Sequence, residues 1–284
     1  MERVGVVGCG LMGSGIAEIA ARAGADVIVV ERDNAALAAG QVRIERSLAR
    51  AVSSGKVPEE EADLARASLT YTNDFALLSD RQFVIEAVAE DEDTKVEIFK
   101  RLDAVIKDPD AILATNTSSI PIIKLAVSTK RPEQVIGMHF FNPVPVLKLV
   151  ELISSLLTSA ETTQRVNDYA TGPLKKRVIT SPDRAGFVVN ALLIPYLLSA
   201  IRMLESGFAS AEDIDTGMVV GCAHPLGPLA LTDLIGLDTT LAVADSLYEE
   251  FKAPHFAPPP LPSRMTQAGL LGRKSGQGFY SYKK

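Results

Sequence analysis

The chain of 284 residues has a hydrophobic content of 47% and a formal net charge of −6 at pH 7. This length suits two domains better than one small core, and the acidic balance leaves no basic face for nucleic acid or for an anionic membrane. The apolar runs are too short to span a bilayer, and the two cysteines, Cys9 and Cys222, lack the spacing of a metal site or a redox pair. Since no leader segment precedes the first strand, we expect a cytoplasmic protein without a bound metal.

The first elements that the sequence predicts are a short strand around residues 4–7, a glycine-rich turn and a helix that ends at Gly24. The turn is Gly8-Cys9-Gly10-Leu11-Met12-Gly13. In such a turn the first glycine allows the sharp bend, the second lets a ligand approach the backbone, and the third lets the helix pack on the strand. Main-chain N–H groups at the helix N-terminus, which begins around Leu11 and Met12, would then bind an anion such as a pyrophosphate.

A second strand, residues 25–30, ends in Glu31. Its distance from the first glycine is close to the roughly 20 residues at which an acidic residue binds a ribose 2′-hydroxyl. Because a carboxylate there repels a 2′-phosphate, we expect NAD rather than NADP as the cofactor, a preference that Arg32 weakens without reversing. The alternative is an ordinary strand–helix–strand unit in which Glu31 is a solvated strand end.

The next predicted helix is capped by Asp33, runs toward Gly55 and carries basic residues along its polar side. Two basic residues, Arg50 near its end and Lys56 just beyond it, could form a patch for the phosphate-bearing tail of a substrate. An acidic protein that binds an anionic ligand needs such a local patch. The alternative is a solvated helix face, which needs no ligand.

Strand patterns then alternate with helical ones, at 69–71, 83–87, 112–114 and 135–138. This alternation predicts an α/β fold with a doubly wound, mostly parallel sheet, whose ligands collect at the carboxyl ends of the strands. The polar residues at these ends, from four separate strands, are Glu31, Glu90, Asn116, Ser118 and His139.

Only helical patterns follow a last strand at 177–180, so we predict a Rossmann-type sheet domain over residues 1–182 and an all-α domain over residues 183–284. The triplet Pro258-Pro259-Pro260 is expected to interrupt the helices. Apolar helices in so small a domain need a partner surface, so we expect a homodimer through this domain. Asn190, in the first of these helices, must bond a neighbouring helix or face a cleft, because an unpaired asparagine is costly to bury.

The candidate for proton transfer is His139. The segment Asn142-Pro143-Val144-Pro145 predicts a turn, and a chain that folds back about residue 145 sets His139 opposite Glu151 as a cross-strand pair. A carboxylate on one imidazole nitrogen fixes the tautomer and raises the basicity of the other nitrogen, as alcohol oxidation requires. A purely structural pair is the alternative, and the nucleotide motif in the same domain favours catalysis.

A hydroxyl group is offered by Ser118, at the end of a neighbouring strand. The alternative role is a helix N-cap, which is common for serine, on the segment that begins at Ile120 or Pro121. The two roles are compatible, because Ser119 could cap that helix instead.

Together these segments resemble the short-chain L-3-hydroxyacyl-CoA dehydrogenases and, within that family, the bacterial 3-hydroxybutyryl-CoA dehydrogenases. The resemblance covers nearly the whole chain, and the histidine segment with its distant glutamate is far more specific than the glycine turn. Besides that turn, the matching segments are Ile85-Glu86-Ala87, Asn116-Thr117-Ser118-Ser119, His139-Phe140-Phe141-Asn142-Pro143, Val150-Glu151, Gly186-Phe187-Val188-Val189-Asn190, His224-Pro225-Leu226-Gly227-Pro228, Leu234-Ile235-Gly236-Leu237-Asp238 and Gly272-Arg273-Lys274-Ser275-Gly276-Gln277-Gly278-Phe279-Tyr280.

The resemblance implies a stand-alone dehydrogenase of acyl-CoA substrates, with a helical domain that closes over the substrate and excludes water. It implies that His139 takes the proton of the 3-hydroxyl while hydride leaves C3 for the nicotinamide, and that Glu151 orients the histidine. Ser118 and Asn190 would hold the oxygens of the substrate, and Asn142 would support the site beside the cofactor. The positions that contact the nicotinamide ribose side in the family correspond to Glu90, Lys95 and Asn116.

Two other functions stay open. A related dehydrogenase of a free hydroxy acid or sugar acid, such as L-gulonate, would need no basic patch for CoA. An NAD-binding protein without catalysis would have no need of Ser118, His139, Glu151 and Asn190 together.

Overall fold

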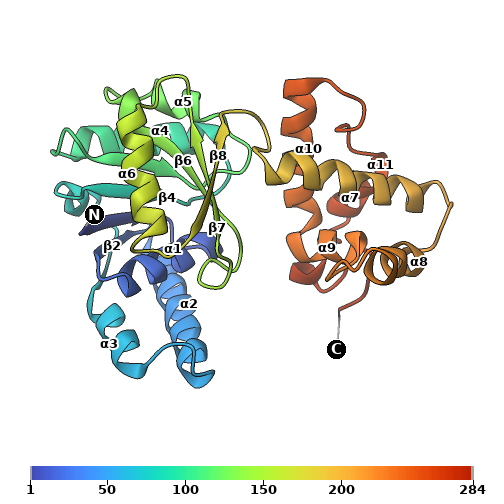
Figure 1. The fold of residues 1–284 in the computed structure, drawn as a ribbon, viewed down its shortest axis with the longest axis horizontal. Coiled ribbons are helices and arrows are strands. Elements are labelled where there is room, and N and C mark those ends of the chain that lie inside the picture. Colours follow the sequence, from blue (N-terminus) through green and yellow to red (C-terminus); the bar gives the residue numbers. More distant parts are fainter. Residues whose placement is uncertain (1, 283–284) are drawn as a thin grey trace. The chain divides into compact units, whose positions relative to one another are not determined.

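The computed structural model describes residues 2–282 and separates into two compact units, with the division between Arg184 and Ala185. The first unit is an α/β domain built on one sheet, and the second unit is helical (Figure 1). The predicted fold class, a Rossmann-type domain followed by an all-α domain, is confirmed. Within residues 2–282, each helix is too short or too polar to cross a membrane.

Eight strands form the sheet of the first unit, in the order β3-β2-β1-β4-β5-β6-β7-β8. Their bounds are β1 Arg3–Val7, β2 Asp26–Val30, β3 Leu69–Thr72, β4 Phe83–Glu86, β5 Ile112–Thr115, β6 Val135–Phe140, β7 Leu149–Ser154 and β8 Arg177–Pro182. Neighbouring strands run parallel except β6 and β7, which are antiparallel. The order reverses at β1, because β2 and β3 lie on one side of it and the later strands on the other. Doubly wound sheets bind dinucleotides at such a switch point.

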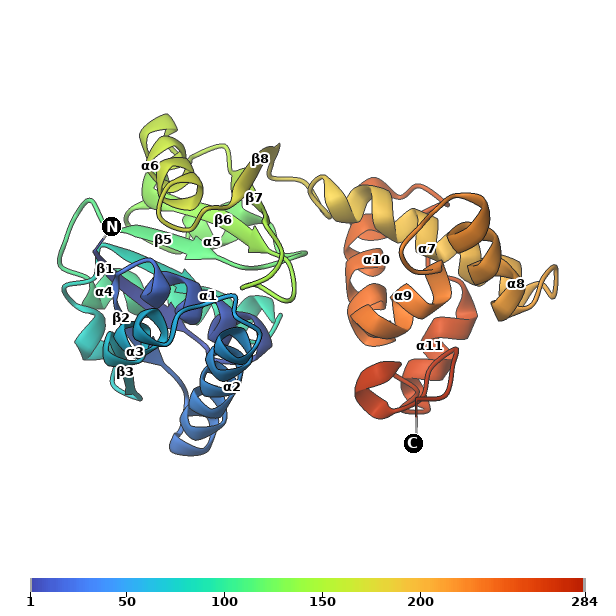
Figure 2. The ribbon, with the colours of Figure 1, turned by 60° about the horizontal axis from the view of Figure 1, so that its bottom comes forward.

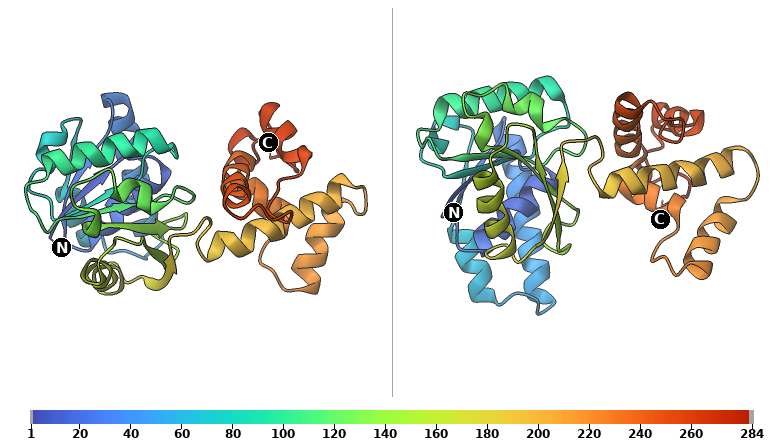
Figure 3. Two further views of the ribbon diagram at one scale, coloured as in Figure 1. Left: turned by 90° about the horizontal axis from the view of Figure 1, so that it is seen from above. Right: turned by 45° about the horizontal axis from the view of Figure 1, so that its top comes forward.

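Helices cover both faces of this sheet, which explains why its strands are apolar on both sides. They are α1 Leu11–Arg22, α2 Asn34–Ser53, α3 Glu59–Ala67, α4 Glu92–Val105, α5 Ile122–Ala126 and α6 Ala160–Thr171, with 3-10 turns η1 Phe75–Leu78 and η2 Pro132–Gln134. Helices α1 and α6 share one apolar core on one face. Figure 3 shows the sheet between α6 on that face and α4 on the other.

The helix boundaries of the first unit follow local sequence signals in two cases. Gly24, with φ +84°, comes directly after the last turn of α1, and a left-handed glycine commonly ends a helix. The Asp33 side chain accepts a hydrogen bond from the main-chain N–H of Ala36 at 2.8 Å and caps α2 as predicted.

The N-cap of α5 is not a serine: the alternative role that the sequence left open for Ser118 and Ser119 is not found, because neither residue occupies the N-cap position. That position belongs to Pro121. The two carboxylate oxygens of Asp183 accept hydrogen bonds from the main-chain N–H groups of Ile122 and Ile123, both at 2.8 Å. Asp183 lies 61 residues after Ile122, so no local spacing reveals this cap.

The second unit contains α7 Val189–Glu205, α8 Ala211–Thr216, a π-helical turn η3 Gly217–Gly221, α9 Pro228–Ile235, α10 Leu237–Phe251, α11 Pro260–Gln267 and a 3-10 turn η4 Arg273–Ser275. Residues of α7, α9 and α10 form its apolar core, including Ile201, Leu229 and Ala244. Pro195 lies inside α7. The proline triplet lies at the end of the break between α10 and α11, as expected, and its last residue begins α11, because proline is tolerated in the first turn of a helix.

Two buried aspartates hold the second unit together. Asp233 accepts hydrogen bonds from the main-chain N–H groups of Phe279 and Tyr280, both at 2.9 Å, and a Cβ at Gly278 would overlap its carboxylate. Asp215 accepts from the N–H of Leu229 at 2.8 Å. The glycine- and proline-rich segments at 224–228 and 272–280 therefore have a structural role as partners of these carboxylates.

Candidate active site

The three glycines of the first turn each meet a different steric demand. Gly8 has φ +92°, and a Cβ there would lie 2.7 Å from the carbonyl oxygen of Ala87. A Cβ at Gly13 would overlap the carbonyl oxygen of Gly8, whereas one at Gly10 would meet no atom within 4 Å. Gly13 therefore serves close packing of α1 on β1, and the open space at Gly10 fits the approach of a ligand to the backbone.

Glu31 lies at the glycine turn. Its Oε1 accepts a hydrogen bond from the main-chain N–H of Cys9 at 2.6 Å, and its Oε2 accepts from the N–H of Arg32 at 3.0 Å. The Arg32 guanidinium is 3.0 Å from the Asp33 carboxylate. The turn is thus bordered by a fixed carboxylate, and Arg32, which follows that carboxylate in the chain, is paired with another acid.

Cys9, inside the turn, is a buried thiol. A Cβ added at Gly40 of α2 would lie only 2.5 Å from the Sγ of Cys9. Burial, reinforced by the negative charge of Glu31, raises the pKa of Cys9 to about 12. The side chain therefore stays protonated and fills space between the turn and α2.

His139 and Glu151 face each other across the antiparallel pair of β6 and β7, so the predicted register is confirmed. The Nδ1 atom of His139 is 2.7 Å from Oε2 of Glu151. Glu151 is fully buried, and the His139 side chain is 9% exposed. Because Nδ1 faces the carboxylate, a proton exchanged with a substrate would be carried by Nε2.

A buried ion pair at the carboxyl ends of β4 and β5 was not predicted from the sequence. Nζ of Lys95 on α4 lies 2.6 Å and 2.9 Å from the two carboxylate oxygens of Glu86, and both side chains are 1% exposed or less. Glu86 also accepts a hydrogen bond from Oγ1 of Thr115 at 2.7 Å. The only sequence signal is a charged residue directly after the apolar run of β4. A buried carboxylate needs such a counter-charge.

Lys95 therefore presents its ammonium inward in this structure, toward Glu86, although the resemblance gives it a contact on the nicotinamide ribose side. The same Nζ lies 3.3 Å from Oε2 of Glu90. Through that second ion pair, Lys95 helps to hold Glu90 in place.

Glu90 organises the loop that follows β5. Its Oε1 accepts hydrogen bonds from Oγ1 of Thr117 at 2.5 Å, from the N–H of Ser118 at 2.8 Å and from the Ser119 hydroxyl at 2.9 Å. Burial alone would raise the pKa of Glu90, but Lys95 and these hydrogen bonds outweigh burial and lower it. An ionised Glu90 thus fixes Ser118, whose hydroxyl lies 3.3 Å from it.

Asn116 connects this loop to the histidine strand. Its Oδ1 accepts a hydrogen bond from the main-chain N–H of Phe140 at 2.9 Å. The ring of Phe141 contacts the His139 ring, with centroids 4.7 Å apart, and Asn142 follows as an exposed residue. The carboxyl ends of β4, β5 and β6 thus bring Glu90, Asn116 and His139 into one hydrogen-bonded region.

The remaining predicted site residues lie elsewhere. Arg50 and Lys56 are exposed at the C-terminal end of α2, where the helix extends beyond the sheet (Figure 2). Asn190 belongs to the first turn of α7 in the second unit and is half-buried.

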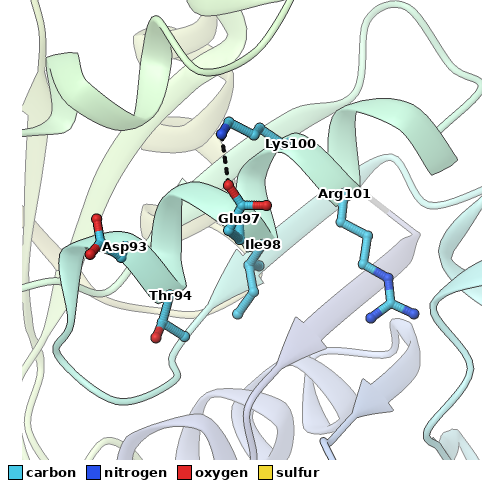
Figure 4. Close-up of a pocket in the computed structure, with 6 residues that line it drawn as sticks. All are labelled: Asp93, Thr94, Glu97, Ile98, Lys100 and Arg101. Atoms are coloured by element: carbon cyan, nitrogen blue, oxygen red, sulfur yellow. Dashed lines mark hydrogen bonds and ion pairs between the residues drawn. The ribbon is translucent and has the colours of Figure 1, made fainter.

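A shallow hollow marks the outward face of α4 (Figure 4), lined by Asp93, Thr94, Glu97, Ile98, Lys100 and Arg101. Lys100 and Glu97 form an ion pair there at 2.7 Å. Lys95 of the same helix is buried, so the hollow is a separate, solvated surface.

The fold and the site define the class of protein. A parallel sheet with a glycine turn at its switch point fits a dinucleotide, and a buried His–Glu pair on neighbouring strands fits proton transfer. The class is that of Rossmann-type oxidoreductases that use a nicotinamide cofactor.

The chain belongs to the 3-hydroxyacyl-CoA dehydrogenase family. Residues 3–184 match the family model "3-hydroxyacyl-CoA dehydrogenase, NAD binding domain", and residues 186–282 match that of the C-terminal domain. The family predicted from the sequence is confirmed, and the free-acid and non-catalytic alternatives are not favoured.

Individual relatives agree over the full length. The chain is 60% identical over 282 residues to 3-hydroxybutyryl-CoA dehydrogenase of Mycobacterium tuberculosis, covering 99% of each. It is 39% identical to the mitochondrial hydroxyacyl-coenzyme A dehydrogenase of Sus scrofa, covering 100% of this chain and 92% of that one. The crystal structure of FadB2 from M. tuberculosis matches with a TM-score of 0.98 and 59% identity, covering 100% of this chain and 99% of that one. The crystal structure of (S)-3-hydroxybutyryl-CoA dehydrogenase PaaH1 from Ralstonia eutropha matches with a TM-score of 0.94 and 45% identity, covering 100% of both chains.

Proposed function

We propose that the protein is an NAD-dependent (S)-3-hydroxybutyryl-CoA dehydrogenase in which His139 is the general base of alcohol oxidation and the general acid of ketone reduction. The observation that carries this proposal is the buried contact of 2.7 Å between His139 and Glu151. The names of the relatives from M. tuberculosis and R. eutropha support the four-carbon acyl-CoA as substrate.

In the proposed mechanism His139 removes the proton of the 3-hydroxyl through Nε2. Glu151 holds the proton on Nδ1, which keeps the ring in the required tautomer and stabilises the imidazolium that forms. A bound nicotinamide would supply the acceptor for the hydride from C3. Ser118 and Asn190 hold the oxygens of the substrate, as the resemblance implies, and Glu90 keeps the Ser118 loop in place.

The residues present fit a bound NAD. The N-terminus of α1, at Leu11 and Met12, would hold the pyrophosphate, since the first turn of this helix carries no acidic residue. Glu31 would bind the adenosine ribose and repel a 2′-phosphate, a preference for NAD that the exposed Arg32 weakens without reversing. On the nicotinamide side the groups that would contact or support the cofactor are Glu90, Asn116, Asn142 and, through Glu90, Lys95.

Two further parts of the proposal concern partners. Arg50 and Lys56 are exposed cations that suit the phosphates of CoA. The second unit exposes large apolar side chains, Leu192 at 74%, Phe208 at 79% and Val220 at 78%, and such surface suits a homodimer. A single-chain mass in light scattering at micromolar concentration would contradict the dimer. The acidic composition with two separate cysteines fits a cytoplasmic enzyme.

The test is a spectrophotometric assay that follows the oxidation of NADH or NADPH with acetoacetyl-CoA, longer 3-ketoacyl-CoA esters and free acetoacetate. We expect the highest kcat/KM for acetoacetyl-CoA with NADH. Faster turnover of the free acid would contradict the CoA substrate, and a preference for NADPH would contradict the cofactor assignment.

A further inference from the structure

The loop that joins β6 to β7, residues 141–148, connects the strands that carry His139 and Glu151. The β6–β7 ladder ends at the pair of Phe140 and Val150. In the loop, the N–H groups of Val146 and Leu147 both donate to the carbonyl oxygen of Pro143, and these two side chains are 60% and 42% exposed. The exposed side chains of Val146 and Leu147 therefore do not hold this part of the loop in place.

Lys176, the residue before β8, supplies contacts from outside the loop. Its Nζ donates hydrogen bonds to the carbonyl oxygens of Val144 at 2.5 Å and Leu147 at 2.6 Å. The residue is 8% exposed. A buried ammonium that is bound by carbonyl groups retains part of its desolvation cost. Burial, together with the positive charge of Arg22, lowers the pKa of Lys176.

Val144 is also the residue through which the loop contacts α1, the helix that begins at the glycine turn. Its side chain is 1% exposed, and it packs on Gly15 of α1, where an added Cβ would lie 2.8 Å from the Val144 Cβ. The residue whose carbonyl oxygen Lys176 binds therefore has its side chain on the helix that begins at the glycine turn.

We propose that Lys176 is a positioning residue for the reaction: its ammonium seats the β6–β7 loop on α1 and thereby fixes His139 relative to the cofactor. The inference rests on the proposed role of His139. Misplacement of a catalytic group by about 1 Å can lower a rate by about a hundredfold. A purely structural lysine would change the stability of the fold and leave the turnover of each folded molecule unchanged.

The test compares Lys176→Met with Lys175→Met, because Lys175 is the neighbouring, exposed lysine. We expect Lys176→Met to lower kcat for acetoacetyl-CoA reduction by about tenfold or more, with the Kd of NADH, measured by fluorescence titration, changed less than about twofold. Lys175→Met should match the wild type. Gly15→Ala pushes on Val144 from the opposite side and should lower kcat in the same way.

A second measurement uses the pH profile. The lowered pKa of Lys176 means that its ammonium is lost at a lower pH than that of an ordinary lysine. Lys176→Arg keeps two donors and a permanent charge, so we expect it to retain more activity than Lys176→Met and to extend the activity toward alkaline pH.

The outcomes separate this inference from the proposed function. A wild type inactive with acetoacetyl-CoA overturns both. An active wild type with equal kcat per folded molecule in Lys176→Met and Lys175→Met overturns the positioning role alone. If Lys176→Met does not fold, the other two variants decide. An alkaline limb of Lys176→Arg that matches the wild type, together with a wild-type kcat for Gly15→Ala, would overturn the role.

Discussion

Replacing Glu151 by glutamine removes the negative charge beside His139 and keeps the shape of the side chain. The two groups are 2.7 Å apart and the glutamate is fully buried, so water cannot replace the lost charge. A hydrogen bond to a charged group contributes about 1.5–3 kcal/mol. If this contribution is needed when the imidazole gains the proton, Glu151→Gln should lower kcat about 10-fold to 150-fold.

The assay is acetoacetyl-CoA reduction, followed by NADH absorbance, for the wild type, Glu151→Gln, His139→Gln and the double variant. Because Glu151 acts through His139, the double variant should be no slower than His139→Gln alone. Thermal unfolding of each variant checks that the proteins are folded. An unchanged kcat in Glu151→Gln, or losses that add in the double variant, would refute the coupling.

Three more perturbations test other parts of the structure. Gly13→Ala places a Cβ on the Gly8 carbonyl oxygen and should weaken NADH binding about tenfold or more, because the close packing at the turn is lost; wild-type affinity in a fluorescence titration would contradict this. Glu31→Ala should weaken NAD binding more than NADP binding, and the reverse order would show that Glu31 is not at the ribose. Lys95→Met leaves Glu86 buried without its counter-charge and should lower the free energy of unfolding in urea by about 3–5 kcal/mol; a loss of about 1 kcal/mol or less, typical of an exposed pair, would contradict it.

The fold class and the pairing of His139 with Glu151 could be predicted from the sequence, because both depend on local patterns. The strands and helices follow from apolar periodicity, and the pairing of His139 with Glu151 follows from the position of the turn between them. Each of these signals lies within one segment or between two adjacent ones.

The features that escaped prediction depend on contacts between distant segments. Asp183 caps α5 from the end of the first unit, and Lys176 binds carbonyl groups about 30 residues earlier. The sequence singled out Lys95 only through the resemblance, as a residue on the nicotinamide ribose side, and only the fold shows that it is buried against Glu86. The start of α11 was missed because a proline triplet favours a break as readily as a helix N-terminus.

The most direct measurement of the central claim is the turnover of His139→Gln with saturating acetoacetyl-CoA and NADH, beside its NADH dissociation constant. If His139 carries the proton, kcat falls by about two orders of magnitude or more while NADH binds almost as in the wild type. Turnover close to that of the wild type would contradict the claim.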